Sequence, residues 1–217
     1  MISYEKHNVE KYKNKREGDY TLALLQNGGH VMFIKQNNLK IRNASAEDAA
    51  ILGKWWRDGK IMAHAGFPNG ISITDKEIVE QLAADTDETH RRLMIEVDDL
   101  AIGEMNYRNK GNEIAQIGIK ICDFSKHEKG YGTTLLKMLI SSLFEEMGYT
   151  KIILDTNLNN LRAQHVYEKL GFRKVAVNHD SWKNQLGELQ SSVDYELTKD
   201  EYLFKLKTTG MPENVTK

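Results

Sequence analysis

The segment His127-Glu-Lys-Gly-Tyr-Gly132 places two glycines directly before a stretch with helical periodicity. Glycine lets the backbone turn sharply, and it lets a ligand approach without obstruction by a Cβ atom. A helix that begins there presents unpaired N–H groups and the positive end of its dipole, which together favour an anion such as a pyrophosphate. We therefore predict a phosphate-binding turn at residues 127–133.

A second group of residues, Asn160, Ala163 and Tyr167, has the spacing i, i+3 and i+7 in a segment that also reads as a helix. This spacing puts all three on one helix face. Because Ala163 is small, a slender ligand could lie against that face, and Tyr167 could offer its hydroxyl as a hydrogen-bond donor or acid. A core tyrosine that packs its ring and wets its hydroxyl would fit the same pattern.

Three interpretations of the glycine-rich segment compete. A dinucleotide-binding fold needs a third glycine where Leu135 stands and alternating strands and helices upstream, although Asp155 lies at a suitable distance. A P-loop needs Gly-Lys-Ser/Thr, which is absent. For the hexapeptide alone, an ordinary turn before a helix fits equally well.

Hydrophobic periodicity and capping signals give the elements that must position these motifs. Helices are expected over residues 46–58, from 74 onward, over 133–147 and 160–170, and after 198. Strands are expected over residues 92–97, 100–108, 113–122, 151–156, 172–177 and 193–197, with a polar stretch at 178–192. The short connections in the middle region predict an antiparallel meander. The strands over 113–122 and 151–156 are expected side by side in parallel, joined by a crossover helix.

The region before residue 39 predicts an extension of this domain. Residues 1–17 are polar and charged, and two β-compatible runs flank Asn27-Gly28-Gly29, which is typical of a hairpin. We expect an N-terminal arm and β-hairpin over 1–38, the main domain over 39–207 and a frayed tail over 208–217. The preferred role of the hairpin is to cover an edge strand. Capping a substrate cleft, or pairing with a second subunit as a homo-oligomer, stays open.

The composition excludes several classes of function. The 217 residues hold 30 Lys and Arg against 31 Asp and Glu, so the chain lacks the basic excess of a nucleic-acid-binding domain. No apolar run approaches the length of a membrane-spanning helix, and no secretory signal is visible. Cys122 is the only cysteine, and the histidines show no metal-ligand spacing. We expect a cytoplasmic protein that binds no metal, no nucleic acid and no membrane.

Taken together, the two motifs resemble the GNAT superfamily of N-acetyltransferases, which use acetyl-coenzyme A. The family's pyrophosphate loop reads Gln/Arg-x-x-Gly-x-Gly/Ala, and this chain has histidine in the first place. The family's later helix reads Asn-x-x-Ala-x-x-x-Tyr-x-x-x-Gly-Phe, which this chain matches at Asn160, Ala163, Tyr167, Gly171 and Phe172. The resemblance covers residues 39 to about 206. It looks like the branch that contains ribosomal-protein N-terminal acetyltransferases, which polyamine and aminoglycoside acetyltransferases also resemble.

The resemblance implies an α/β (α+β) fold with a mixed, mostly antiparallel central sheet flanked by helices. It also implies that the backbone N–H groups of 127–133 hold the pyrophosphate of acetyl-CoA and that Tyr167 protonates the sulfur. Asn160 and the backbone of the preceding strand would bind the pantetheine arm. The implied cofactor-binding residues are Ile119, Ile121, His127, Glu128, Lys129, Gly130, Tyr131, Gly132, Thr133, Asn160, Ala163 and Tyr167.

The acceptor side departs from the family pattern. Many relatives carry Ala-Glu-Ile-Gly before the loop, whereas this chain has Ala115-Gln116-Ile117-Gly118, and a glutamine cannot take a proton. Glu104 on the neighbouring strand is the predicted base or amine-binding group, and water-relayed deprotonation is the alternative. Trp55 and Trp56 are not expected to face the core together, because the apolar stripe of their helix is narrow. The predicted acceptor-side residues are Trp56, His64, Glu104 and Gln116.

The resemblance implies an enzyme that transfers an acetyl group from acetyl-CoA to an amine by direct attack. The acceptor is a peptide N-terminus or a small amine such as a polyamine or an aminoglycoside. The alternative is a catalytically silent acyl-CoA-binding regulatory module on the same fold, which Gln116 favours because it replaces a glutamate.

Overall fold

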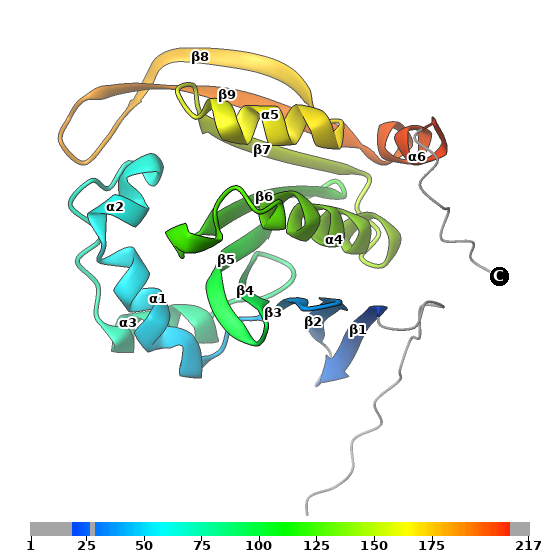
Figure 1. Ribbon diagram of the computed structural model, residues 1–217, viewed down its shortest axis with the longest axis horizontal. Coiled ribbons are helices and arrows are strands. Elements are labelled where there is room, and N and C mark those ends of the chain that lie inside the picture. The colour runs from blue at the N-terminus through cyan, green and yellow to red at the C-terminus, as the bar shows by residue number, and fades with distance from the viewer. Residues whose placement is uncertain (1–18, 27–28, 209–217) are drawn as a thin grey trace, which may run out of the picture.

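The computed structural model describes residues 19–26 and 29–208. The predicted charged arm, the Asn27-Gly28 turn and all of the predicted tail except Thr208 lie outside the described residues. Within these residues, nine strands form one sheet in the order β1-β2-β3-β4-β5-β6-β7-β9-β8 (Figure 1). The strands are β1 (Asp19–Gln26), β2 (Gly29–Gln36), β3 (Leu39–Asn43), β4 (His90–Val97), β5 (Leu100–Asn109), β6 (Ile114–Ile121), β7 (Lys151–Asn157), β8 (Arg173–Lys183) and β9 (Leu189–Thr198).

Strand pairing confirms the mixed, mostly antiparallel sheet. All neighbouring strands are antiparallel except β6 and β7, which run parallel as the crossover predicts. The meander β4-β5-β6 excludes the alternating strands and helices of a dinucleotide-binding fold. Strand β2 pairs with β3, and its Met32 and Ile34 are buried in the core. The hairpin therefore covers the edge of β3, as predicted.

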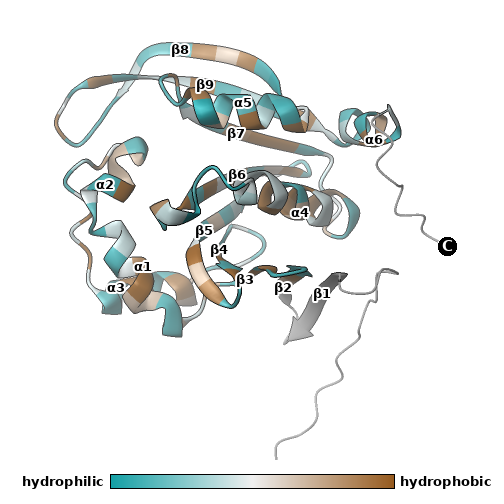
Figure 2. Ribbon diagram, viewed as in Figure 1, coloured by the Kyte–Doolittle hydropathy of each residue, from teal (hydrophilic) through white to brown (hydrophobic). Residues whose placement is uncertain are grey.

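Helices lie on both faces of the sheet (Figure 1). They are α1 (Ala49–Trp56), α2 (Gly59–Met62), α3 (Asp75–Ala83), α4 (Tyr131–Glu145), α5 (Leu161–Leu170) and α6 (Lys199–Thr208), with 3-10 turns η1 (Ala46–Asp48), η2 (Ala63–Ala65) and η3 (Phe124–Lys126). Side chains alternate between the two faces of a strand, so β4 contributes residues to a hydrophobic core on each face of the sheet. Leu93 and Ile95 pack with α4, whereas Met94 between them packs with α1 and α3. Figure 2 shows the apolar residues of the strands and inner helix faces in brown.

The capping signals explain where the helices begin. Thr74 and Glu77 form the predicted capping box of α3, and Thr198 with Glu201 forms that of α6. Helix α2 and η2 lie between the first two helices predicted from the sequence. Asp58 starts α2, because its carboxylate accepts the Lys60 N–H at 2.8 Å.

Residues 178–183 and 189–192 are strand, where the sequence predicts only a polar stretch. Strand β8 continues to Lys183 and β9 begins at Leu189, so the two form a long antiparallel hairpin. Most of its side chains are at least partly exposed on both faces, so the sequence carries no alternation that could reveal it. Its tip packs against the loop after η2, where Gln185 donates its N–H to Gly66 O at 2.7 Å. The hairpin thus reaches the α2 end of the molecule (Figure 1).

The parallel pair β6 and β7 separates along its length. Pairing covers only Ile114–Gln116 of β6 and Lys151–Ile153 of β7. Beyond that point β6 runs on to Ile121 and β7 to Asn157 without pairing to each other. This split leaves one backbone edge of β6 open.

Candidate active site

A cleft of about 950 Å³ opens where β6 and β7 separate. One wall comes from β6, the start of α4 and α5, and the opposite wall from α2, η2 and β8. Eight of the residues predicted from the sequence line it: His64, Ile119, Ile121, His127, Gly132, Asn160, Ala163 and Tyr167. Four more, from Glu128 to Tyr131, and Thr133 form the turn and first helical residues beside it. Trp56, Glu104 and Gln116 are not among the described lining residues.

The turn before α4 has the geometry of an anion site. Gly130 precedes the helix with a φ of 79°, and no side chain caps the first turn, so its N–H groups point out without such a partner. A Cβ added at Gly132 would meet nothing within 4 Å. Open space therefore adjoins the positive end of α4, which fits the diphosphate of coenzyme A.

The ring of His127 is held on both nitrogens. Nε2 donates to the Ile121 carbonyl at 2.9 Å, and Arg162 Nη1 donates to Nδ1 at 3.3 Å. Phe124 packs edge-on against the ring, with centroids 5.1 Å apart. The imidazole therefore braces the turn against the end of β6 and brings the Arg162 cation to the same end of the cleft.

Asn160 has a structural task in addition to the predicted one. Its Oδ1 accepts the Ala163 N–H at 3.2 Å, which caps α5, and its Nδ2 donates to Thr156 Oγ1 at 3.3 Å. The side chain nevertheless lines the cleft. Binding of the pantetheine arm by Asn160 stays a prediction.

Tyr167 lies between the core and the cleft. Only 7% of the residue is exposed, and its ring packs against Phe172 and Tyr195 with centroids 6.0 and 5.7 Å apart. Burial, with the charge of Asp155 as the second cause, raises the pKa of Tyr167 to about 12. The phenol therefore keeps its proton at neutral pH and can donate it inside the cleft.

The two tryptophans correct one expectation. Trp55 and Trp56 are both buried, at 6% and 7% exposure, so the view that they cannot face the core together is wrong. The apolar face of α1 is wide because it packs against both α3 and the sheet. Trp56 is not among the described residues that line the cleft, and its Nε1 donates to the Glu104 carboxylate at 3.0 Å.

The Glu104 carboxylate is occupied by neighbouring donors. Besides the Trp56 indole, Lys120 Nζ donates to it at 3.0 Å from the adjacent strand β6. Its role as proton acceptor stays a prediction. Gln116 is placed differently, because its Nε2 donates to Oδ1 of Asp155 on β7 at 3.2 Å.

Sequence reasoning missed several lining residues. Arg162 stood inside the helix motif, and its cationic type next to a phosphate-binding turn was an available signal. Asp155 was considered only for its spacing from the glycines. Trp182 could not be found, because it depends on the β8–β9 hairpin that brings it over Gly66. Among the described residues, no group of three metal-ligating side chains occurs and no helix could span a membrane.

The sheet is mostly antiparallel, and it splits between β6 and β7 beside the start of α4. This arrangement agrees with the acetyltransferase fold that the sequence motifs indicate. Residues 38–173 match the family model of the acetyltransferase (GNAT) domain, so the chain belongs to the GNAT acetyltransferase family.

Known relatives agree with this fold. The structure is similar to that of spermidine N-acetyltransferase from Vibrio cholerae in complex with CoA and spermine, with TM-score 0.67, 20% identity and coverage of 76% of this chain and 98% of that chain. It is also similar to the apo form of RimL, a ribosomal L7/L12 alpha-N-protein acetyltransferase, with TM-score 0.67, 13% identity and coverage of 81% and 99%. A kanamycin resistance protein of Rhizobium radiobacter is 41% identical over 54 residues, 25% of this chain. The matched segment spans 50% of that curated relative.

Proposed function

We propose that this protein transfers the acetyl group of acetyl-CoA to an amine. The observation that carries the proposal is the cleft at the β6–β7 split, which has an uncapped helix start at one end and the Tyr167 residue in its wall. Acetyl-CoA supplies the thioester, and residues of the chain must bind the co-substrate and move the protons of the reaction. Family membership supports this chemistry, and the CoA in a structurally similar protein supports the co-substrate.

The cleft offers a binding group for each part of the co-substrate. The N–H groups at the start of α4 would hold the diphosphate, and Gly132 leaves the room. The open edge of β6 from Ile117 to Ile121 would pair its backbone with the pantetheine amides, as an added strand does. Arg162, beside the turn, adds positive charge for the phosphates.

Tyr167 supplies the acid of the reaction. Its high pKa keeps the hydroxyl protonated, so it can give a proton to the departing sulfur. The acceptor is a primary amine of a peptide N-terminus or of a small molecule. The names of similar proteins, which concern spermidine, ribosomal protein L7/L12 and kanamycin, support both groups. The cytoplasmic location stays a prediction from the sequence.

A thiol-release assay tests the proposal. Acetyl-CoA is incubated with the protein and a panel of peptides, polyamines and aminoglycosides, and free thiol is followed with a chromogenic disulfide. Release that depends on both protein and amine is expected. Binding of CoA without turnover for any amine would contradict the proposal and favour the silent acyl-CoA-binding module.

A glycine variant tests the cofactor site without relying on turnover. Gly132→Val places a side chain in the open space beside α4, where nothing else lies within 4 Å, so binding should suffer while folding does not. We expect CoA affinity measured by calorimetry to fall by about tenfold or more. Lys137→Val is the matched control, because Lys137 is an exposed residue of the same helix. Equal CoA affinities of the two variants would contradict the proposal that this turn binds the diphosphate.

A further inference from the structure

The β7 side of the split carries a carboxylate that the chemistry above does not use. Asp155 lines the cleft and is exposed to it. Among the described residues, the only hydrogen bond to its carboxylate comes from Gln116 Nε2 at 3.2 Å, and no cation lies within ion-pair distance. A carboxylate without a cationic partner among the described residues therefore lies in the cleft where we propose that the amine binds.

The strand geometry puts Asp155 on the acceptor face of the sheet. Leu154 is buried in the core under α4, so the next residue along β7 points to the opposite face. Gln116 lies on that same opposite face, because its neighbour Ile117 packs under α4. The face also borders α2 and η2, which form the other wall of the cleft.

Asp155 and Tyr167 both line the cleft, Asp155 from β7 and Tyr167 from α5, the helix that follows β7. After burial, the charge of Asp155 is the cause that raises the pKa of Tyr167. A proton acceptor and a proton donor thus face one cleft from different elements, β7 and α5.

The position is costly for the sheet. Asp155 stands directly opposite Asp194 of β9 in the strand register, and like charges in that relation are destabilising. Asp194 accepts a hydrogen bond from Asn178 Nδ2 at 2.9 Å and does not line the cleft. Residues that break a stability rule without compensation tend to mark functional sites.

We infer that Asp155 takes the proton from the acceptor amine and that Gln116 positions its carboxylate; the inference rests on the proposed acetyl transfer. A proton of the bound ammonium passes to Asp155. The amine nitrogen then bonds to the acetyl carbon while the carbon–sulfur bond breaks, and the sulfur takes the Tyr167 proton. The second amine proton returns to the Tyr167 oxygen, and Asp155 releases its own to water.

Asp155 meets this requirement better than Glu104. The Glu104 carboxylate accepts from both Trp56 and Lys120, and it does not line the cleft. The other charged or titratable residues that line the cleft are Lys60, His64, Lys120, His127, Arg162 and Tyr167. Asp194 lies opposite Asp155 in the strand register.

The test compares four variants with an amine that the wild type acetylates. Asp155→Asn should lower kcat by about 100-fold and remove the acidic limb of its pH profile. CoA affinity by calorimetry and the melting temperature should not fall. Adding Gln116→Glu to Asp155→Asn should restore part of kcat, since it returns a carboxylate to the same place. Asp194→Asn is the matched control on the neighbouring strand and should keep the wild-type rate.

Each outcome decides the matter. Wild-type turnover with full activity of Asp155→Asn would overturn the inference and leave the proposed function standing. An increase in the acceptor KM alone would make Asp155 an amine-binding group and not a proton acceptor, which also overturns it. A 100-fold loss in Glu104→Gln with none in Asp155→Asn would assign the proton to Glu104. Absence of turnover by the wild type with every amine would remove both proposals.

Discussion

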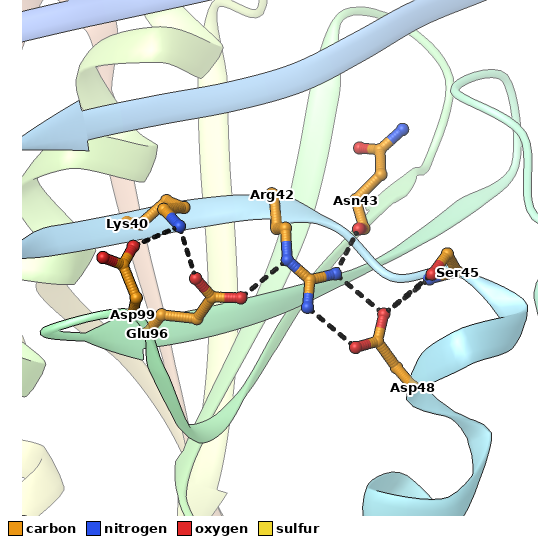
Figure 3. Close-up of polar contacts among 7 residues, drawn as sticks. All are labelled: Lys40, Arg42, Asn43, Ser45, Asp48, Glu96 and Asp99. Atoms are coloured by element: carbon orange, nitrogen blue, oxygen red, sulfur yellow. Dashed lines mark hydrogen bonds and ion pairs between the residues drawn. The ribbon is translucent and has the colours of Figure 1, made fainter.

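Two groups of acidic side chains lie in the same sheet and are treated in opposite ways. Beside β3, Asp48 of η1 and Glu96 of β4 are buried, and Arg42 and Lys40 of β3 pair with them (Figure 3). At β7 and β9, Asp155 and Asp194 face each other in register, and each accepts a hydrogen bond from a neutral side-chain amide. The compensated group joins β3, β4 and η1 to one another. The uncompensated carboxylate in the cleft remains free to act on a ligand.

The network in Figure 3 shows what compensation requires. Arg42 reaches both carboxylates, with Nε 2.7 Å from Glu96 and Nη2 2.7 Å from Asp48. Lys40 Nζ bridges Glu96 and Asp99, each at 2.7 Å. The network ties β3 and β4 to η1. This difference predicts that variants of the cleft change the rate, whereas variants of the network change stability.

The largest effect is expected at the acid of the cleft. Tyr167→Phe removes the proton donor but keeps the packed ring, so kcat should fall by about 100-fold or more while the melting temperature stays near that of wild type. Because the pKa of Tyr167 is raised to about 12, the wild-type rate should not decline between neutral pH and pH 10 through loss of this proton.

A neighbouring tyrosine provides the control for that variant. Tyr195 packs against Tyr167, but its hydroxyl donates to Glu168 at 3.0 Å and it does not line the cleft. Tyr195→Phe should lower stability by about 1 kcal/mol and leave kcat unchanged. Equal kcat losses in both variants would mean that the aromatic packing, and not the Tyr167 proton, supports the rate.

The network should respond in stability. Arg42→Gln leaves Asp48 and Glu96 buried without their main partner, which should lower the free energy of unfolding by about 3 kcal/mol in urea titrations. The kcat at low temperature should be unchanged. Lys76→Gln breaks the exposed pair with Glu80 and should cost less than about 0.5 kcal/mol. A loss of kcat in folded Arg42→Gln would contradict the view that the network affects only stability and the cleft only the rate.

The same network gives a pH dependence with a definite sign. Burial would raise the pKa of Asp48, but the hydrogen bonds from Arg42 and the Ser45 N–H outweigh it and hold the pKa below its usual value. A carboxyl whose folded pKa is depressed stabilises the protein above its unfolded pKa and loses that contribution as the pH falls through the folded pKa. Wild-type stability should therefore drop below about pH 4, and it should drop less steeply in Arg42→Gln.

A smaller effect is expected from His90 at the start of β4. Burial, then the charges of Arg92 and Arg108, lower the pKa of His90 to about 4. Between that value and an unfolded pKa of about 6.5, the unfolded chain binds more protons, so stability falls as the pH falls. His90→Gln should reduce this loss between pH 6.5 and 4 by about 1–2 kcal/mol, since screening weakens a partly exposed group. Identical pH slopes for both proteins would contradict it.

The sequence predicted the elements that bury an alternating or periodic apolar face. The meander β4-β5-β6, α4, β7 and α5 have such faces, and the glycine turn and Tyr167 came with them. The outer part of the β8–β9 hairpin, residues 178–192, is largely exposed and has no such pattern, so its tip contact with Gly66 and the position of Trp182 were missed.

The acceptor side was harder to predict because it depends on contacts between distant strands. The proposed role of Asp155 depends on the separation of β6 from β7 and on the hydrogen bond from Gln116. Both features bring together residues that lie far apart in the sequence. Glu104 was chosen because it lies on the strand next to Gln116, and that position does not say which donors occupy its carboxylate. The partners Trp56 and Lys120 come from α1 and β6.

The smallest effect is expected at His127, where the family pattern has another residue type. Its ring joins Ile121 O to Arg162 and so supports the turn from the side, while the diphosphate is assigned to backbone N–H groups. His127→Ala should therefore raise the KM for acetyl-CoA by only about fivefold, the worth of one hydrogen bond, with unchanged kcat and melting temperature. His127→Gln should recover much of the loss, because its amide can reach the same two partners. An unchanged KM in His127→Ala would discard any side-chain role, and a loss of kcat would mean that the turn positions the thioester as well as the phosphates.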